Sequence, residues 1–287
     1  MTSATDRLRT LIERPGIISM PGCHDALSAS LIEQAGFETA FMSGFAVSSS
    51  RLGMPDTGLI SYAEMVDQGR NICSRVNMPM FGDGDTGFGN ALNVKRTVEG
   101  YAQAGFACIM IEDQVMPKRC GHTKGKQVVS RDESFSRIQA AVDTRNEGAD
   151  ILIMARTDAR TTHDIDEAIF RAQEFARIGA DITFLEAPES VEEMQLYCDS
   201  VPGHKMANMI EQGKTPVLPP EQLEQMGYKI QVFPLTLLNA SIRAMRESLE
   251  MMKQGKTPDN IMCFEELKDA VGFNEYYEKF DRYKWSE

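Results

Sequence analysis

The feature that most constrains the fold of this chain is a glycine that recurs between a helix-like stretch and the strand-like stretch after it. Such junctions lie at Gly36, Gly105, Gly148, Gly179 and Gly227. Glycine readily adopts the left-handed conformation with which helices commonly end. A helix cap that recurs in this way, each time with a strand after it, indicates a chain that alternates α-helices with β-strands.

Hydrophobic periodicity places the strands and the helices between them. The predicted strands cover residues 16–20, 39–42, the stretch that leads into Asp83, 107–111, 150–155, 182–185, 205–207 and 230–233. The predicted helices cover residues 6–13, 25–35, 62–74, 91–103, 130–145, 165–178, 191–199 and 220–226. Ser130 and Glu133 have the spacing of a capping box for the helix at 130–145.

This alternation favours a closed (β/α)8 TIM-type barrel. A doubly wound open sheet would need a Gly-x-Gly-x-x-Gly after its first strand, and the sequence has none there. A chain of 287 residues with 42% hydrophobic residues can bury one sizeable core. We predict a barrel over residues 1–234 and a C-terminal helical segment over residues 235–287 within the same domain.

Polar residues follow most of the predicted strands directly, and the carboxyl ends of barrel strands meet at one rim. These residues are Ser43, Asp83, Asp85, Glu112, Arg156, Glu186 and Asn208. Each also has an ordinary reading: Arg156 and Asp158 as an ion pair, Glu186 as a strand-end acid, Asn208 as a turn former. Their convergence on one rim predicts an active site.

The stretch at residues 111–126, here called the cysteine segment, combines a thiol with several charges around Lys118-Arg119-Cys120-Gly121-His122. Nothing in it resembles core, so we predict a mobile active-site loop. Cations beside a cysteine lower its pKa from about 8.5, so Cys120 is predicted to titrate closer to neutrality. The alternatives are a basic surface loop or a zinc site, and the second lacks the four ligands that structural zinc needs.

Asp83 and Asp85 lie among glycines, and an extended backbone would point both carboxylates the same way. Such a pair repels itself unless a cation lies between, and hard carboxylate oxygens suit Mg2+ or Mn2+. The alternative is a polar Gly-Asp turn; the later ligands of an EF-hand and the Gly-Lys-Ser/Thr of a phosphate loop are missing. Asp56, in a Pro-Asp-Thr-Gly turn, is expected to be exposed.

The net charge of −12 argues against a nucleic-acid partner, so the basic cysteine segment predicts a small anionic substrate. The six cysteines are scattered as reduced intracellular thiols are. The first residues lack the apolar run of a signal peptide, and no stretch is apolar enough to span a membrane. We therefore expect a cytoplasmic protein with no membrane partner.

The motifs together resemble the isocitrate lyase/phosphoenolpyruvate mutase superfamily over nearly the whole chain. Besides the Lys-Arg-Cys-Gly-His stretch, they are Ser43-Gly44, Pro55-Asp56, Asp83-Gly84-Asp85-Thr86-Gly87-Phe88-Gly89-Asn90, Ile111-Glu112-Asp113-Gln114, Ala155-Arg156-Thr157-Asp158-Ala159, Glu186-Ala187 and the run from Asn208 to Pro216. The resemblance implies a magnesium-dependent carbon–carbon lyase of the 2,3-dimethylmalate or 2-methylisocitrate type. Such an enzyme cleaves a 2-hydroxy dicarboxylate into a 2-oxoacid and a carboxylate.

The resemblance also implies roles for individual residues. Asp83 would hold Mg2+ (or Mn2+) directly, with Asp85, Asp56 and Glu112 reaching it through water. The implied substrate-binding residues are Ser43, Gly44, Phe45, Arg156, Glu186, Asn208, Gly121 and His122. The implied catalytic residues are Cys120, as the general acid, with Lys118, His122, Arg156 and Glu112. Members of the family are usually tetramers with swapped C-terminal helices, here at 235–252 and 264–283.

Two departures from the family pattern bear on the reaction. Phe41 stands where lyases of the methylisocitrate type carry a tyrosine, which leaves a metal-bound group or Glu112 as the base. The run from Asn208 to Pro216 is similar to dimethylmalate lyases, petal-death-type proteins and oxaloacetate hydrolases, which favours a malate-like substrate. Pro234 stands near the position where we expect a serine in oxaloacetate hydrolases, which argues against that activity.

Several other functions compete with the lyase. An oxaloacetate hydrolase, forming oxalate and acetate, or an oxaloacetate decarboxylase would use the same pocket. A phosphonopyruvate mutase or hydrolase is disfavoured because those relatives lack the Cys-Gly-His stretch. A non-catalytic metal-binding barrel would keep the acids but has no need of the thiol.

Overall fold

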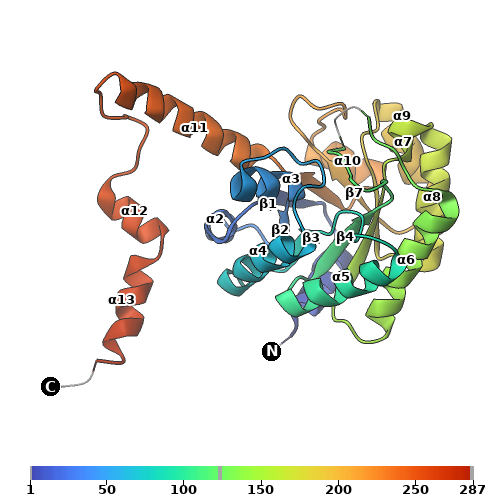
Figure 1. Ribbon diagram of the computed structural model, residues 1–287, viewed down its shortest axis with the longest axis horizontal. Helices are drawn as coiled ribbons and strands as arrows, with labels where there is room; N and C mark the ends of the chain where they lie inside the picture. Colours follow the sequence, from blue (N-terminus) through green and yellow to red (C-terminus); the bar gives the residue numbers. More distant parts are fainter. Residues whose placement is uncertain (1, 122–124, 285–287) are drawn as a thin grey trace. The chain divides into compact units, whose positions relative to one another are not determined.

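The computed structural model of the protein describes residues 2–121 and 125–284. It forms two compact units, residues 1–237 and residues 238–287. The first unit is a closed barrel in which neighbouring strands run parallel in chain order and β1 pairs with β8 (Figure 1). The strands are β1 (Ile18–Cys23), β2 (Ala40–Met42), β3 (Met80–Asp83), β4 (Cys108–Glu112), β5 (Leu152–Thr157), β6 (Ile182–Leu185), β7 (His204–Asn208) and β8 (Ile230–Phe233). The predicted (β/α)8 barrel is confirmed.

Helices surround the strands on the outside of this barrel (Figure 1). They are α1 (Ala4–Glu13), α2 (Ala26–Gln34), α3 (Gly44–Val47), the π-helical turn η1 (Ser48–Leu52), α4 (Tyr62–Arg75), α5 (Ala91–Ala104), α6 (Arg131–Asn146), α7 (Ala159–Thr162), α8 (Ile165–Ile178), α9 (Val191–Ser200) and α10 (Pro220–Met226). The helices of the C-terminal part are α11 (Thr236–Lys253), α12 (Phe264–Ala270) and α13 (Phe273–Asp281).

The recurring glycines do end their helices. The φ angles are positive at all of them: 86° at Gly36, 101° at Gly105, 120° at Gly148, 114° at Gly179 and 105° at Gly227. A residue with a Cβ is strained in this region, whereas glycine is not. The helices at these junctions therefore end as predicted, each at a glycine with a positive φ.

The core has an inner and an outer part. Inside the barrel, side chains from the strands pack with one another, among them Phe81, Met110 and Met154. Leu8 and Leu11 of α1 join this inner cluster, and the Thr5 hydroxyl donates to the Asp150 carbonyl (2.9 Å), just before β5. The outer part fills the space between strands and helices. Burying one large apolar side chain stabilises a fold by about 1.5–3 kcal/mol.

Several local predictions were incomplete. The stretch after Ser43, for which no helix was predicted, forms α3 and η1, and a further short helix, α7, follows β5. The helix predicted over 264–283 is divided into α12 and α13, and Gly272 between them has a φ of 85°. The capping box at Ser130 is only half formed: the hydroxyl accepts from Glu133 N (3.2 Å), but the Glu133 carboxylate pairs with Arg137 (2.5 Å).

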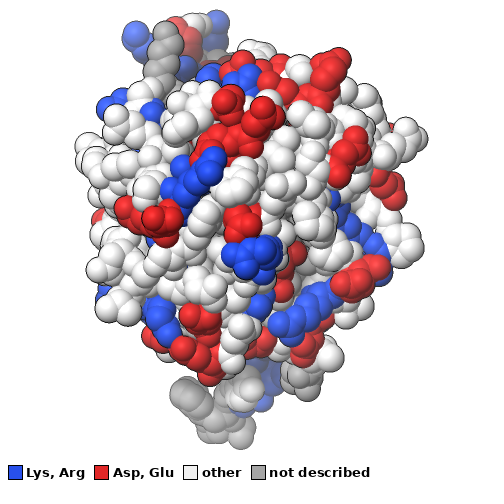
Figure 2. Space-filling model, turned by 90° about the vertical axis from the view of Figure 1, so that its right-hand side faces the viewer, with Lys and Arg blue, Asp and Glu red and all other residues white. Residues whose placement is uncertain are grey.

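Charges of both signs lie next to one another on the face shown in Figure 2. Ion pairs also link parts of the barrel's outer layer, such as Arg145 with Asp181 (2.6 Å) and Arg160 with Glu193 (2.7 Å). Surface pairs of this kind contribute about 0–1 kcal/mol each, so the packed core carries most of the stability.

The second unit exposes large apolar side chains. On α11, Met245, Leu249 and Met252 are 56%, 63% and 61% exposed. Their spacing puts them on one face of the helix. The helices within the described residues are too short or too polar to cross a membrane.

Candidate active site

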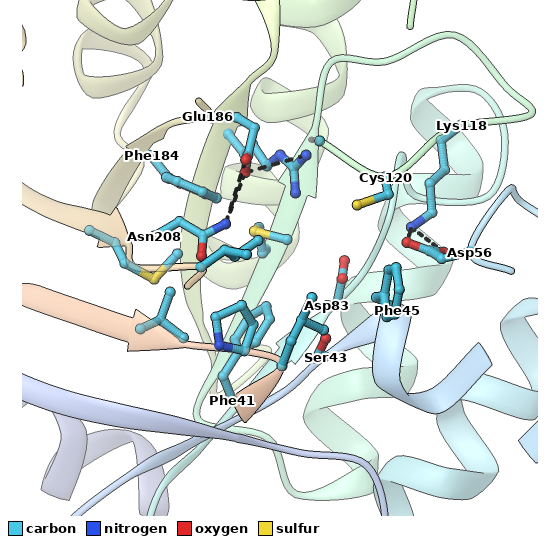
Figure 3. Close-up of a pocket in the computed structure, with 18 of the residues that line it drawn as sticks. Phe41, Ser43, Phe45, Asp56, Asp83, Lys118, Cys120, Phe184, Glu186 and Asn208 are labelled. Carbon is cyan, nitrogen blue, oxygen red and sulfur yellow. Dashed lines mark hydrogen bonds and ion pairs between the residues drawn. The ribbon is translucent and has the colours of Figure 1, made fainter. Parts of the chain in front are cut away.

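A pocket opens where the strands of the barrel end (Figure 3). It is lined by Phe41, Ser43, Phe45, Asp56, Asp83, Met110, Lys118, Arg119, Cys120, Gly121, Arg156, Phe184, Glu186, Met206, Asn208, Ile210, Val232, Pro234 and Leu235. The lining joins strand-end residues to residues 118–121 of the cysteine segment, which lie more than thirty residues before Arg156 in sequence. In Figure 3 the Cys120 side chain points into the pocket, and Asp83 lies below it, between Cys120 and Ser43.

Asp83 ends β3 with its carboxylate held by backbone amides. Gly44 N donates to Oδ2 (3.0 Å) and Asp85 N donates to Oδ1 (3.1 Å). A Cβ added at Gly44 would lie 2.7 Å from Asp83 Oδ2, so glycine is what lets this backbone approach the carboxylate. The Gly44 amide, predicted to bind substrate, is thus already engaged with Asp83.

The predicted parallel arrangement of Asp83 and Asp85 is wrong. Asp85 has a φ of 48°, so the segment is not extended there, and Asp85 is fully buried rather than open to the pocket. Burial raises the pKa of Asp85 to about 7, against the opposing effect of Lys118. Asp85 therefore lies beneath the pocket, where its charge needs a nearby cation.

Lys118 of the cysteine segment supplies that cation. Its Nζ lies 2.6 Å from Asp56 and 2.8 Å from Asp85, and the side chains of all three are nearly fully buried. Burial lowers the pKa of Lys118, but Asp85 and Asp56 outweigh burial and raise it well above its usual value. The expectation that Asp56 is exposed is wrong, because the Pro-Asp-Thr-Gly turn packs under the cysteine segment and Asp56 pairs with Lys118.

A second charged cluster lies at the ends of β4, β5 and β6. Arg156 donates from Nε and Nη2 to Asp158 (2.9 and 3.0 Å), and its guanidinium lies 3.4 Å from Glu112 and 3.5 Å from Glu186. Arg156 therefore both forms the ion pair with Asp158 and lines the pocket at the rim of the barrel. Burial raises the pKa of Glu112 well above its usual value, although Arg156 opposes this.

Asn208 completes this side of the pocket. Its Nδ2 lies 3.5 and 3.4 Å from the two carboxylate oxygens of Glu186, which is long for a hydrogen bond. The Asn208 Oδ1 is buried and has no hydrogen-bond partner among the described residues. The Asn208 side chain therefore retains hydrogen-bonding capacity for a ligand in the pocket.

The carboxylates around the pocket suit a divalent metal. Asp85 Oδ2 and Glu112 Oε1 are buried without a hydrogen-bond partner in the part of the chain that the structure describes. No three acidic, histidine or cysteine side chains within residues 2–121 and 125–284 stand in the arrangement of a preformed metal cluster. Mg2+ keeps several waters and takes few protein ligands, so direct ligation by Asp83 with the other carboxylates behind water fits this donor set.

The cysteine segment is more deeply buried than predicted. Glu112, Asp113, Gln114, Lys118 and Lys126 are each at most 7% exposed. Long-range partners explain this burial: the Asp113 carboxylate accepts from Thr157 Oγ1 (2.7 Å) and from Asp158 N (2.9 Å). Cys120 itself is half-buried and lines the same pocket as Asp83. His122, predicted to be catalytic and to bind substrate, lies outside the described residues.

Gly121 is packed against the strand-end charges. A Cβ added here would lie 2.5 Å from Glu186 Cδ and 2.6 Å from Arg156 Nη2. We expect Gly121→Ala to lower kcat about tenfold to a hundredfold, because the methyl group would push Cys120 out of place by an ångström or so. Steady-state kinetics alongside thermal unfolding checks this. An unchanged kcat would show that this close contact has no part in catalysis.

Sequence reasoning missed the apolar part of the lining. Phe184, Met206 and Val232 each lie two residues before a rim position, namely Glu186, Asn208 and Pro234. Residues two apart in a strand point to the same side, so counting back from the polar strand-end residues Glu186 and Asn208 would have found Phe184 and Met206. Arg119, Ile210 and Leu235 also line the pocket, but no such pattern marks them.

Comparison with known proteins agrees with this architecture. The phosphoenolpyruvate phosphomutase family matches residues 8–253. The chain is 43% identical over 276 residues to the 2,3-dimethylmalate lyase of Eubacterium barkeri, and the aligned residues cover 95% of each chain. It is 42% identical over 273 residues to the 2-methylisocitrate lyase of Aeropyrum pernix, which covers 94% of this chain and 87% of that one.

A solved structure of oxaloacetate acetylhydrolase, in complex with the inhibitor 3,3-difluorooxalacetate, superposes with a TM-score of 0.92 at 35% identity. The superposition covers 97% of this chain and 96% of that one. The family match, the level of identity and the shared barrel all extend over nearly the whole chain. The protein therefore belongs to the phosphoenolpyruvate phosphomutase family, within the phosphoenolpyruvate mutase/isocitrate lyase superfamily.

Proposed function

We propose that this protein is a divalent-metal-dependent carbon–carbon lyase that cleaves a substituted malate into a 2-oxoacid and a carboxylate. The observation that carries the proposal is that Asp83, Arg156 and Cys120 line one pocket. A carboxylate for a metal, a fixed cation for an anionic substrate and a thiol for proton transfer are the groups that this reaction needs.

Asp83 would hold Mg2+ or Mn2+ directly, with Asp85, Asp56 and Glu112 behind water molecules. When bound, the metal supplies a Lewis acid for the C2 oxygen of the substrate. Lys118 contacts Asp56 and Asp85 and so fixes these two side chains in place. Hard carboxylate oxygens favour Mg2+ or Mn2+ over softer metals.

Arg156 binds and orients the substrate dianion. Asp158 holds the guanidinium through two hydrogen bonds, which fixes its plane before the substrate arrives. Ser43 and Phe45 lie across the pocket, and Glu186 with Asn208 offers oxygens and an amide to the substrate's polar groups.

The base that removes the C2 hydroxyl proton cannot be Phe41, which lines the pocket but has no group to accept a proton. We assign the role to Glu112. Its carboxylate lies 3.4 Å from Arg156, and burial raises its pKa well above its usual value, although Arg156 opposes this. A carboxylate with a raised pKa is a stronger proton acceptor once it is ionised.

Cys120 completes the cleavage. As the C2–C3 bond breaks, the bonding electrons remain on C3, and the Cys120 thiol donates a proton to that carbon. The C2 oxygen, having lost its proton to the base, becomes the carbonyl of the 2-oxoacid product. The cysteine segment packs over the pocket through Gly121, which limits the access of water to the carbanion.

The lining favours an alkyl substituent on C3. Phe184, Met206 and Ile210 provide apolar walls, and a methyl or similar group would be buried against them. Pro234 also lines the pocket and offers no hydroxyl. An oxaloacetate hydrolase remains the second candidate because the fold of an oxaloacetate acetylhydrolase superposes so closely on this one.

One assay separates these functions. The protein is incubated with Mg2+ and, in separate reactions, with malate, alkylated malates including 2,3-dimethylmalate, 2-methylisocitrate or oxaloacetate, and the products are identified by mass spectrometry. A 2-oxoacid with a matching carboxylate from an alkylated malate supports the proposal. Oxalate and acetate from oxaloacetate, with no cleavage of any malate, would replace it by the hydrolase. Reactions with a chelator in place of Mg2+ are the control.

We further propose that the protein works in the cytoplasm as a homotetramer with swapped C-terminal helices. The support for the assembly is the family membership and the exposed apolar face of α11, because faces of this kind usually mark an interface. The six free cysteines suit a reducing compartment. Light scattering after size exclusion tests the assembly, and a monomer at micromolar concentration would contradict it.

A further inference from the structure

Lys126 is a buried cation that the proposed reaction does not use. Its side chain is 0% exposed; Nζ lies 2.8 Å from Asp158 Oδ1 and donates a closer hydrogen bond to the Gly121 carbonyl. A buried ammonium is costly unless it is paired and hydrogen-bonded. Lys126 therefore ties the backbone beside Cys120 to the residue that follows β5.

Asp158, the acid at the other end of this tie, is itself rigidly held. Its two carboxylate oxygens accept from the Arg156 guanidinium, and its amide donates to Asp113 Oδ1 (2.9 Å). Burial raises the pKa of Asp158, but Arg156 and Lys126 outweigh burial and lower it below its usual value. The charged carboxylate is thus a fixed anchor shared by Arg156 and Lys126.

Cys120 lies between two such fastenings. On its N-terminal side, the side-chain amide of Gln114 accepts from Arg119 N through Oε1 and donates to Arg119 O through Nε2, both at 2.9 Å. On its C-terminal side, Lys126 holds the Gly121 carbonyl, and the Gly121 Cα faces Arg156 and Glu186. The backbone on both sides of the thiol is therefore fixed, but only the Lys126 fastening shares an acid with the substrate-facing Arg156.

We propose that Lys126 is a positioning residue that sets the place of the Cys120 thiol relative to Arg156, by fastening the Gly121 carbonyl to Asp158. The catalytic consequence rests on the proposed lyase function. The contact of Lys126 with the Gly121 carbonyl and Asp158 does not depend on that function, and it can be tested by a measurement that requires no substrate.

That readout is the reactivity of the Cys120 thiol. In Lys126→Met, which keeps the length of the side chain but removes the donors, we expect iodoacetamide to alkylate Cys120 about tenfold faster, because the local opening of the segment becomes more frequent. Peptide mass spectrometry follows each cysteine separately. Cys73 and Cys263, far from this contact in sequence and not fully buried, serve as internal controls whose rates should not change. We expect kcat on the cleaved malate to fall about tenfold to a hundredfold with little change in KM.

Three further variants keep the test decisive. Lys126→Arg retains a charged donor and should restore the alkylation rate to within about threefold of wild type. If Lys126→Met does not fold, Lys126→Gln takes its place and is compared with Lys126→Arg. Lys95→Met, which removes an exposed ion pair with Glu147, should leave both readouts unchanged. An unchanged Cys120 alkylation rate in a folded Lys126→Met protein would overturn the proposal. If even the wild type cleaves no malate, the proposed function fails while the alkylation comparison still decides the role of Lys126.

Discussion

We expect Cys120→Ser to lower kcat by about a thousandfold, within the hundredfold to ten-thousandfold range of general acid catalysis. The reason is the acidity of the group: a thiol has a pKa of about 8.5, whereas a serine hydroxyl does not ionise in this range. Steady-state kinetics on the best malate substrate checks this. Cys120 is half-buried in the pocket lining, so we expect the variant to fold, and thermal unfolding checks this.

The matched control for this variant is Cys263→Ser. Cys263 is exposed and lies in the second unit, before α12, so its replacement should leave kcat unchanged. Deuterium incorporation at the α-carbon of the carboxylate product, which was C3 of the substrate, can still be followed at long times in Cys120→Ser. If Cys120→Ser keeps the wild-type turnover, Cys120 is not the acid.

We expect Asp83→Ala to lower metal-dependent turnover by about a thousandfold or more. Lewis-acid stabilisation is worth several kcal/mol, and about 1.4 kcal/mol corresponds to a factor of ten in rate. Calorimetric titration with Mg2+ should show that binding is lost together with activity. Asp83 also accepts hydrogen bonds from Gly44 N and Asp85 N, so some loss of stability accompanies the change.

Asp83→Asn separates the two effects, because the amide oxygen keeps one acceptor for these backbone donors while the charge is lost. We expect the asparagine variant to fold and still to bind Mg2+ poorly. Asp67→Asn is the control: Asp67 is an exposed acid on α4 that pairs with Arg51, so metal binding and turnover should stay at the wild-type level. Metal-dependent turnover in folded Asp83→Ala would rule out Asp83 as the direct ligand.

The parts of the fold that could be predicted are those that local chemistry dictates. A glycine after a helix adopts a positive φ wherever the chain goes next, which is why Gly105, Gly179 and Gly227 marked their junctions correctly. The bounds of α8, α10 and β6 likewise follow from periodicity and capping. Helices α3 and α7 were missed because each is only four residues long, too short to show a helical period.

The candidate site was predictable only in outline. Strand-end residues converge in any parallel barrel, so the place of Asp83, Arg156, Glu186 and Asn208 at one rim follows from topology. The burial of Asp56 does not, because its partner Lys118 lies 62 residues further along the chain. The sequence around either residue gives no indication of this pairing. Without knowledge of Lys118, the turn around Asp56 is predicted to be exposed.

The sequence by itself determined the alternation of strands and helices, the closed barrel and the residues gathered at its rim, because caps, periodicity and strand ends act over a few residues. Only the tertiary structure decided which charges are buried together: Lys118 with Asp56 and Asp85, and Lys126 with Asp158 and the Gly121 carbonyl. The physical reason is that a charge is stable inside a protein only beside an opposite charge or a hydrogen-bonding partner, and that partner is chosen by the fold rather than by sequence neighbours.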